Sequence, residues 1–235
     1  MPIPSYTIHA LELGPMENFV YLVVDHLSQR TAVVDPAWDV PAILQKALDL
    51  QVRVTDILLT HSHHDHINGV AALLAATDAQ VHLTHAEAKF WGSSLGKPQL
   101  HHGGEYIKLG GTQINVLHTP GHTPGSACFQ LSEHLVCGDT LFVYGCGRCD
   151  LRGGDPEQMF STLRRLATDL PRELITLPGH NYSVKTSCTL GEQIEGNPFL
   201  HFNHRDQFVH YRTKTHDRIR VMPMQAIRRD ELENL

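Results

Sequence analysis

Ten consecutive residues, Thr60-His61-Ser62-His63-His64-Asp65-His66-Ile67-Asn68-Gly69, place four histidines and an aspartate between two apolar segments. Residues 54–59 have the pattern of a short buried strand, and residues 69–76 that of an apolar helix. The histidines are therefore predicted to lie on a strand-to-helix connection. Imidazole nitrogens and a carboxylate oxygen suit zinc, iron or manganese better than calcium or magnesium.

In an extended loop, His61 and His63 can point one way while Asp65 and His66 serve a neighbouring position. One segment could then supply ligands to two adjacent metals. The alternative is a solvated histidine-rich loop or an expression tag. The run is internal, is interrupted by serine and aspartate, and is bounded by a predicted strand and helix, so the metal interpretation is favoured.

Residues 60–69 match the T-H-x-H-x-D-H signature of the metallo-β-lactamase superfamily, and three later segments resemble the same family in the same order. These segments are Thr119-Pro120-Gly121-His122-Thr123-Pro124-Gly125-Ser126, Cys137-Gly138-Asp139-Thr140-Leu141-Phe142 and Pro178-Gly179-His180-Asn181-Tyr182. The resemblance implies an α/β fold, the four-layer αββα sandwich. It also implies a catalytic domain over residues 1–200, followed by a short C-terminal tail over residues 201–235 that packs on the same domain.

Seven positions in these motifs carry the ligand types of the family. The resemblance assigns His61, His63 and His122 to one metal, Asp65, His66 and His180 to a second metal, and Asp139 to a bridging position between them. The last three motifs each follow a predicted strand, where a scaffold can present convergent side chains. Two divalent ions are thus expected as cofactors, zinc first, with iron or manganese as alternatives.

Two cations about 3.5–4 Å apart lower the pKa of a bridging water, so that hydroxide exists near neutral pH. One metal can also polarise a substrate carbonyl, so no serine or cysteine nucleophile is required. Asp65 could orient the hydroxide as well as bind metal, which makes it the candidate catalytic residue. The arrangement suits hydrolysis of an ester, lactone, thioester or phosphodiester.

Residues 140–148 and 178–182 are similar to glyoxalase II, the hydroxyacylglutathione hydrolase, as are residues 224–229 near the C-terminus. This likeness implies a thioester hydrolase in which Arg148, Tyr182 and Arg228 bind the thiol carrier of the substrate. The alternatives are a turn arginine, a partly buried tyrosine and a solvated helix charge.

Two departures from that likeness concern glutathione itself. Asp150 stands where the glutathione-binding enzymes carry a tyrosine, and Glu231 stands where a second basic contact is expected. The tail after His180 is also much shorter than the helical domain that those enzymes use. The substrate is therefore expected to be a small-molecule thioester, or an acyl group on a carrier protein, with glutathione or another thiol as the carrier.

Cys146-Gly147-Arg148-Cys149 allows other interpretations. Similar Gly-Cys-Gly-Arg segments occur in persulfide dioxygenases of the superfamily, whose one iron would here be held by His61, His122 and Asp139. A lactone or ester hydrolase and a non-enzymatic metal-binding regulator are further alternatives. The C-x-x-C lacks a second ligand pair and a thioredoxin-like context, which favours unpaired thiols.

Elsewhere the pattern alternates short strands with helices and contains no linker-like segment. Strands are expected near residues 6–13, 19–24, 31–35, 80–84, 106–109, 113–117, 126–131, 134–137 and 173–177, and helices near 39–50, 86–91 and 156–166. Residues 92–104, including His101 and His102, are expected to form a polar surface loop. Asp35 either supports the metal loop or caps a turn.

Composition excludes several classes of protein. The chain has 235 residues, 41% of them hydrophobic, which is enough for one sizeable core. A formal charge of −6 disfavours a nucleic-acid partner, and no run of about 18 apolar residues predicts a membrane span. The first residues lack the pattern of a secretion signal, so a cytoplasmic location with free thiols is expected. Arginines after residue 204 could contact an acidic partner or form a solvated face, and the sequence indicates no oligomeric state.

Overall fold

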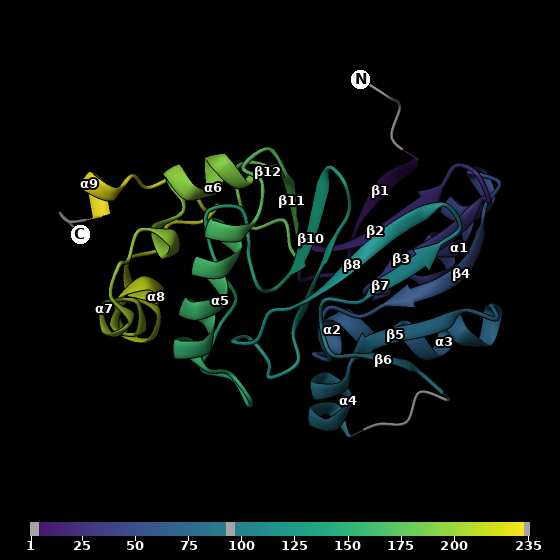
Figure 1. Cartoon of the computed structure of the whole chain (residues 1–235), viewed down its shortest axis with the longest axis horizontal. Coiled ribbons are helices and arrows are strands. Elements are labelled where there is room, and N and C mark those ends of the chain that lie inside the picture. The colour runs from purple at the N-terminus through teal and green to yellow at the C-terminus, as the bar shows by residue number, and fades with distance from the viewer. Residues whose placement is uncertain (1–4, 93–96, 233–235) are drawn as a thin grey trace.

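Two six-stranded sheets lie face to face, with helices on their outer faces (Figure 1). The computed structural model describes residues 5–92 and 97–232. The expected αββα sandwich is confirmed.

The first sheet has its strands in chain order, antiparallel from β1 to β3 and parallel from β3 to β6. Its strands are β1 (Tyr6–Leu13), β2 (Asn18–Asp25), β3 (Arg30–Val34), β4 (Arg53–Leu58), β5 (Gln80–Thr84) and β6 (Gln99–His101). The second sheet is antiparallel except for the parallel pair β10 and β11. Its strands are β7 (Tyr106–Leu109), β8 (Thr112–His118), β9 (Ala127–Gln130), β10 (His134–Gly138), β11 (Ile175–Pro178) and β12 (Cys188–Thr189).

Helices before β6 accompany the first sheet, and the later helices accompany the second. The first group is α1 (Val40–Asp49), α2 (His64–Ile67), α3 (Val70–Ala76) and α4 (His85–Trp91). The second group is α5 (Pro156–Asp169), α6 (Leu190–Gly196), the 3-10 turn η1 (Pro198–Leu200), α7 (Arg205–His210), the π-helical turn η2 (Tyr211–Thr215), α8 (His216–Ile219) and α9 (Arg229–Leu232).

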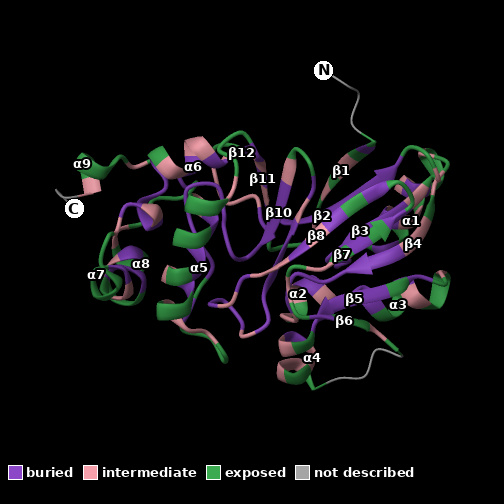
Figure 2. Cartoon of the chain, in the orientation of Figure 1, coloured by how far each residue is buried: buried purple, intermediate pink, exposed green. Residues whose placement is uncertain are grey.

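Strand β2 shows how the layers form, because every residue in it is buried (Figure 2). Successive side chains of a strand point to opposite faces. Tyr21 therefore lies in the same buried cluster as Phe129 of the second sheet, while Leu22 lies in a different cluster with Ile43 of α1. A strand that is apolar on both faces is stable only when both faces are covered, so the sequence of β2 requires a layer on each side.

The start of helix α5 is specified locally. Asp155 precedes Pro156, and its side chain accepts hydrogen bonds from the backbone N–H groups of Glu157 and Gln158 at 2.9 and 3.0 Å. An aspartate cap followed by proline in the first turn satisfies N–H groups that have no partner within the helix. Met159 of this helix then lies in the same buried cluster as Leu135 of the second sheet.

The structure differs from the expected pattern in two places. The segment around the histidine motif is helical over His64–Ile67 rather than fully extended. Within the expected polar loop over residues 92–104, Gln99–His101 form edge strand β6, and residues 93–96 lie outside the described part. His101 is buried against His82, whose Nδ1 lies 3.1 Å from His101 Nε2, so the surface-loop prediction was wrong for His101.

The residues after 200 lie at the side of the molecule away from β1–β4, and among them α7 packs on α5 (Figure 1). Phe208 of α7 is fully buried in the same cluster as Met159 and Leu163 of α5. The division of the chain at residue 200 stays a prediction. Among the described residues, no helix has the length and apolar character that crossing a bilayer requires.

Candidate metal centre

The first three-residue group joins two loops. His61 and His63 follow β4, and His122 lies in the loop between β8 and β9. One ligand atom from each lies within 4.8 Å of the others. The rings are almost perpendicular, with centroids 4.5–4.7 Å apart, so the structure brings together the three residues predicted to share a metal.

The second group is formed by Asp65 and His66 of α2 together with His180, which follows β11. The Nδ1 atom of His66 donates to Asp35 Oδ2 at 2.9 Å, and that of His180 donates to the backbone oxygen of Met16 at 2.8 Å. In the neutral ring, each Nε2 atom therefore carries the lone pair. These two Nε2 atoms lie 3.2 Å apart, a separation that suits two ligands of one cation.

Asp139 lies between the two groups. Its Oδ1 atom is 3.3 Å from Nε2 of both His66 and His180, and its Oδ2 atom is 3.4 Å from Nε2 of His122. This is the position that a bridging ligand requires. His61 Nε2, His122 Nε2 and Asp139 Oδ1 are buried without a hydrogen-bond partner, which is costly unless a cation engages them. The donor set thus fits two divalent ions.

The protonation states of these groups also suit metal binding. Burial lowers the pKa of His61 well below its usual value, with further contributions from His66 and His122, and burial lowers the pKa of His122 to about 4. Burial opposes ionisation of Asp139, but His180 and His66 outweigh it and hold its pKa well below the usual range. His61 and His122 are therefore neutral imidazoles and Asp139 a carboxylate, the forms that coordinate metals. Burial opposes protonation of His66 and His180, but Asp139 outweighs it and raises the pKa of both, so these two rings release a proton when a cation binds.

Asp35 orients the histidine motif rather than only capping a turn. Besides its contact with His66, it accepts hydrogen bonds from the backbone N–H of Thr60 at 2.7 Å and from the Thr60 hydroxyl at 2.5 Å. The same hydroxyl lies 3.0 Å from His61 Nδ1. One buried carboxylate thus fixes one histidine from each group.

Glu87 of α4 joins the loops that carry the first group, and it gave no functional signal in the sequence. Its Oε1 atom accepts from the backbone N–H and hydroxyl of Ser62 at 2.7 and 2.6 Å. Its Oε2 atom accepts from the Thr123 hydroxyl at 2.7 Å and the Gly125 N–H at 3.0 Å. A glutamate in the first turn of a helix after Thr84 is typical of a capping residue, which is why the pattern did not single it out.

Asn18 and Trp38 position Asp65. The Asn18 amide donates to Asp65 Oδ2 at 3.0 Å and to the Asp65 backbone oxygen at 3.1 Å, and Asn18 accepts from the Trp38 indole at 2.8 Å. Hydrogen bonds of this kind fix a metal-binding carboxylate in one orientation. Both residues were missed in the sequence because each lies far along the chain from the motif.

Two glycines permit the close approach of the loops. A Cβ atom at Gly179 would collide with Oδ1 of Asp139, and one at Gly147 would collide with the backbone oxygen of Asp139. Any larger residue at either position would push the loops away from Asp139. The glycine in the Pro178-Gly179-His180 motif therefore has a steric reason.

A cleft of about 450 Å³ opens onto both groups. Arg148 and Tyr182, the predicted substrate-binding residues, line it, and Arg212 and Arg220 from the C-terminal segment line it as well. Arg228 does not line this cleft; it is exposed, and its backbone N–H donates to Glu231 at 2.7 Å.

Arg148 is not a free cation in this cleft. Its guanidinium forms two hydrogen bonds to Asp150, at 2.9 and 2.7 Å. Tyr182 instead stacks on His180, with ring centroids 4.6 Å apart and an interplanar angle of 9°. The two hydrogen bonds to Asp150 therefore offset the positive charge of Arg148.

All five cysteines lie in the described part, where they are buried and unbridged.

Residues 13–180 match the family model described as the metallo-β-lactamase superfamily. The chain belongs to that superfamily. The family match covers all seven predicted ligand positions, and membership confirms the resemblance drawn from the four motifs.

Two groups of curated relatives are similar to this superfamily member. It is 31% identical over 212 residues to a probable polyketide biosynthesis zinc-dependent hydrolase, BaeB of Bacillus velezensis, covering 89% of this chain and 94% of that protein. It is 38% identical over 173 residues to the hydroxyacylglutathione hydrolase of Aeromonas hydrophila, covering 72% of this chain and 63% of that protein. The likeness to glyoxalase II is confirmed, although the match spans less than two thirds of that relative's length.

Solved structures of the superfamily agree with the fold. ETHE1 from Myxococcus xanthus superposes with a TM-score of 0.81 at 30% identity, covering 88% of this chain and 90% of that one. TTHA1623 in a di-iron-bound form superposes with a TM-score of 0.68 at 32% identity, covering 82% of this chain and all of that one. Since one relative is described as zinc-dependent and another structure holds two irons, superfamily membership fixes divalent-metal binding but not the element.

Proposed function

We propose that this protein is a binuclear metallohydrolase that cleaves thioesters and whose preferred thiol carrier is not glutathione. The observation that carries the proposal is the position of Asp139, with one carboxylate oxygen beside His66 and His180 and the other beside His122. Two complete ligand groups joined by one carboxylate favour a two-metal hydrolase over a single-iron oxygenase, which needs only one group.

Two bound divalent ions would supply an activated water and polarise the substrate carbonyl. The protein's own residues set the geometry for that chemistry. Asp65 is held by Asn18 and retains a side-chain exposure of 15%, so its carboxylate can orient a water at the floor of the cleft. Tyr182 stacks beside His180 and forms the wall past which a substrate enters.

Support for a thioester comes from the relatives, of which several are named hydroxyacylglutathione hydrolases. Support for another thiol carrier comes from the cleft. Arg148 is paired with Asp150, and Arg228 lies outside the cleft, so two of the expected contacts to glutathione are lost. A hydrolase named for polyketide biosynthesis matches nearly its whole length to this chain, which favours an acyl group on pantetheine or on a carrier protein.

The test combines metal analysis with a substrate panel. The purified protein is assayed for metal content, and thiol release is measured with acyl-pantetheine, acyl-carrier protein and S-lactoylglutathione. A lactone, a phosphodiester and a persulfide with an oxygen electrode complete the panel. We expect two metals per chain and a higher kcat/KM for the pantetheine thioesters than for S-lactoylglutathione.

Three outcomes would contradict the proposal. Faster cleavage of S-lactoylglutathione than of the pantetheine thioesters would assign glyoxalase II activity to the protein. Faster cleavage of the lactone or phosphodiester would assign another hydrolase. One iron per chain with oxygen uptake on the persulfide would make the protein a dioxygenase.

A further inference from the structure

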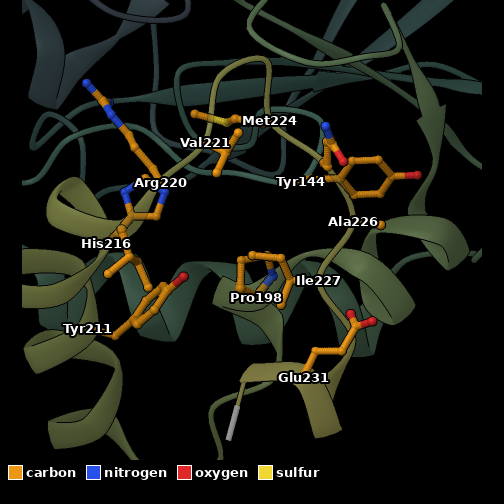
Figure 3. A pocket seen from close by; sticks show the side chains of 12 residues that line it. Tyr144, Pro198, Tyr211, His216, Arg220, Val221, Met224, Ala226, Ile227 and Glu231 are labelled. Carbon is orange, nitrogen blue, oxygen red and sulfur yellow. The ribbon is translucent and has the colours of Figure 1, made fainter. Parts of the chain in front are cut away.

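A second cavity, of about 320 Å³, adjoins the metal cleft. It is built by residues from the C-terminal segment together with Tyr144 and Pro198. Figure 3 shows Met224 and Val221 on one side of it and Tyr211, Pro198 and Ile227 on the other. Its volume lies near the lower end of the range of about 300–1,000 Å³ that is usual for small-molecule sites.

The cavity and the metal cleft share three lining residues, His216, Arg220 and Met224. Met224 is fixed in place by its backbone: its N–H donates to the Tyr182 oxygen at 2.7 Å, and its oxygen accepts from the Val184 N–H at 3.1 Å. Tyr182 itself lines the metal cleft. Met224 therefore stands at the boundary between the two spaces, and a substrate lying over the metal ligands can extend past it.

The charges of the cavity lining offset each other and give no net attraction for an anion. Glu231 contributes a carboxylate to the wall and Arg220 a guanidinium, whose Nη1 atom lies 3.9 Å from Asp217. His216 is occupied by Arg212, at 2.9 Å, and by Asp217, at 3.0 Å. A carboxylate or phosphate entering the cavity would lose hydration and meet Glu231 as well as Arg220, whereas a hydrocarbon chain would find mainly apolar side chains.

Two apolar side chains at this junction are unusually exposed. Val221, which lines the cavity, is 69% exposed, and Met222, which lines the metal cleft, is 48% exposed. An apolar group bound across the junction would remove this surface from water, which is favourable in proportion to the area covered.

We propose that this cavity holds the uncharged acyl chain of the substrate, with the thioester carbonyl over the metal ligands and the thiol carrier on the side of Arg148. This inference rests on the proposed thioesterase activity and adds the substrate class, which is thioesters of aliphatic acids several carbons long. Met224, Ala226 and Ile227 line the cavity (Figure 3), so we expect these residues to determine the chain length that it accepts.

Binding of non-hydrolysable thioethers tests the inference apart from catalysis. S-alkyl-pantetheines from methyl to decyl are titrated into the purified protein by calorimetry. Each methylene that enters the cavity should tighten binding by up to about fourfold. Ala226 lines the cavity (Figure 3), so the indole of Ala226→Trp would take up part of its volume, and in that variant we expect the dependence on chain length to disappear.

The controls separate this result from general effects. Val184→Trp adds the same ring at a side chain that is 54% exposed and lines neither space, so it should keep the dependence on chain length. Ile227→Ala enlarges the cavity and should move the optimum to longer chains, which provides a second measurement if Ala226→Trp is poorly folded by circular dichroism.

Different failures have different meanings. Equal affinity for methyl and decyl thioethers in the wild-type protein would overturn the inference even if thioesters are cleaved. Equal weakening of all chain lengths by Ala226→Trp would place the pantetheine arm in the cavity instead and also overturn it. Length-dependent binding without any thioester cleavage would refute the proposed function while leaving the cavity as a site for aliphatic chains.

Discussion

Glu87→Gln should both destabilise the fold and weaken metal binding, although Glu87 is not a predicted ligand. Glu87 is fully buried, and its two carboxylate oxygens accept four hydrogen bonds from the loops that carry His63 and His122. Glutamine has nearly the same shape, but one of its two terminal atoms is an NH₂ group that cannot accept. In the variant, two of the four donor groups therefore face an NH₂ group instead of an acceptor oxygen.

The expected size of the effect follows from those two bonds. A hydrogen bond to a charged group contributes about 1.5–3 kcal/mol, so losing two costs about 3–6 kcal/mol. The hydroxyl of Ser62 or Thr123 can rotate and accept from the new amide, but the backbone N–H of Ser62 or Gly125 cannot. We therefore expect a loss near the lower end, about 3 kcal/mol in the free energy of unfolding.

The assay is urea unfolding of the metal-depleted protein in chelator, which separates fold stability from stabilisation by bound metal. Competition with a chromophoric chelator then measures metal affinity on the folded variant. Glu133→Gln, at an exposed position on the β9–β10 turn, is the matched control and should change neither quantity. An unfolding free energy for Glu87→Gln within about 0.5 kcal/mol of wild type would refute the reasoning, since changes of that size are typical of surface positions.

Three further predictions concern other carboxylates. Asp139→Ala should reduce metal content below two ions per chain and abolish thiol release, because both groups lose a ligand; full occupancy by elemental analysis would contradict the bridging assignment. Burial opposes ionisation of Asp25, yet hydrogen bonds from Ser28 and Thr112 lower its pKa to about 2. Its stabilisation is therefore present above the unfolded pKa of about 3.9 and is lost as pH falls towards 2, so unfolding of Asp25→Asn should depend less on pH between these values; an unchanged slope would refute this. Asp150→Asn should release Arg148 and lower KM for S-lactoylglutathione by up to about fivefold, the size typical of an exposed ion pair, with little change for a neutral carrier; equal changes for both substrates would argue against it.

The ligand residues were predicted from short local patterns in the sequence. Each motif places a histidine or aspartate directly after a strand, and strands are recognisable from short apolar runs bounded by glycine or proline. The resemblance supplied the pairing of His122 with His61 and of His180 with His66, which spacing alone does not provide. The structure brings these residues together because the loops that follow β4, β8, β10 and β11 lie at the same end of the two sheets.

The substrate contacts were less predictable because they depend on where the C-terminal segment packs. Arg228 was expected at the site and lies outside the cleft, whereas Arg212, buried in the π-helical turn, lines it. Both belong to a basic stretch whose local pattern does not separate a buried arginine from an exposed one. His101 is a similar case, since its burial depends on pairing of β6 with the distant strand β5.

The sequence by itself determined the superfamily, the alternating strands and helices, and the residue types able to hold two metals. Those features are encoded by neighbours within a few positions of one another. Only the tertiary structure decided that Asp35 and Glu87 hold the metal loops, that Asp150 neutralises Arg148, and that Met224 stands between the cleft and a second cavity. These features depend on close contacts that the folded chain creates, mostly between residues far apart in sequence, and a local pattern carries no record of such contacts.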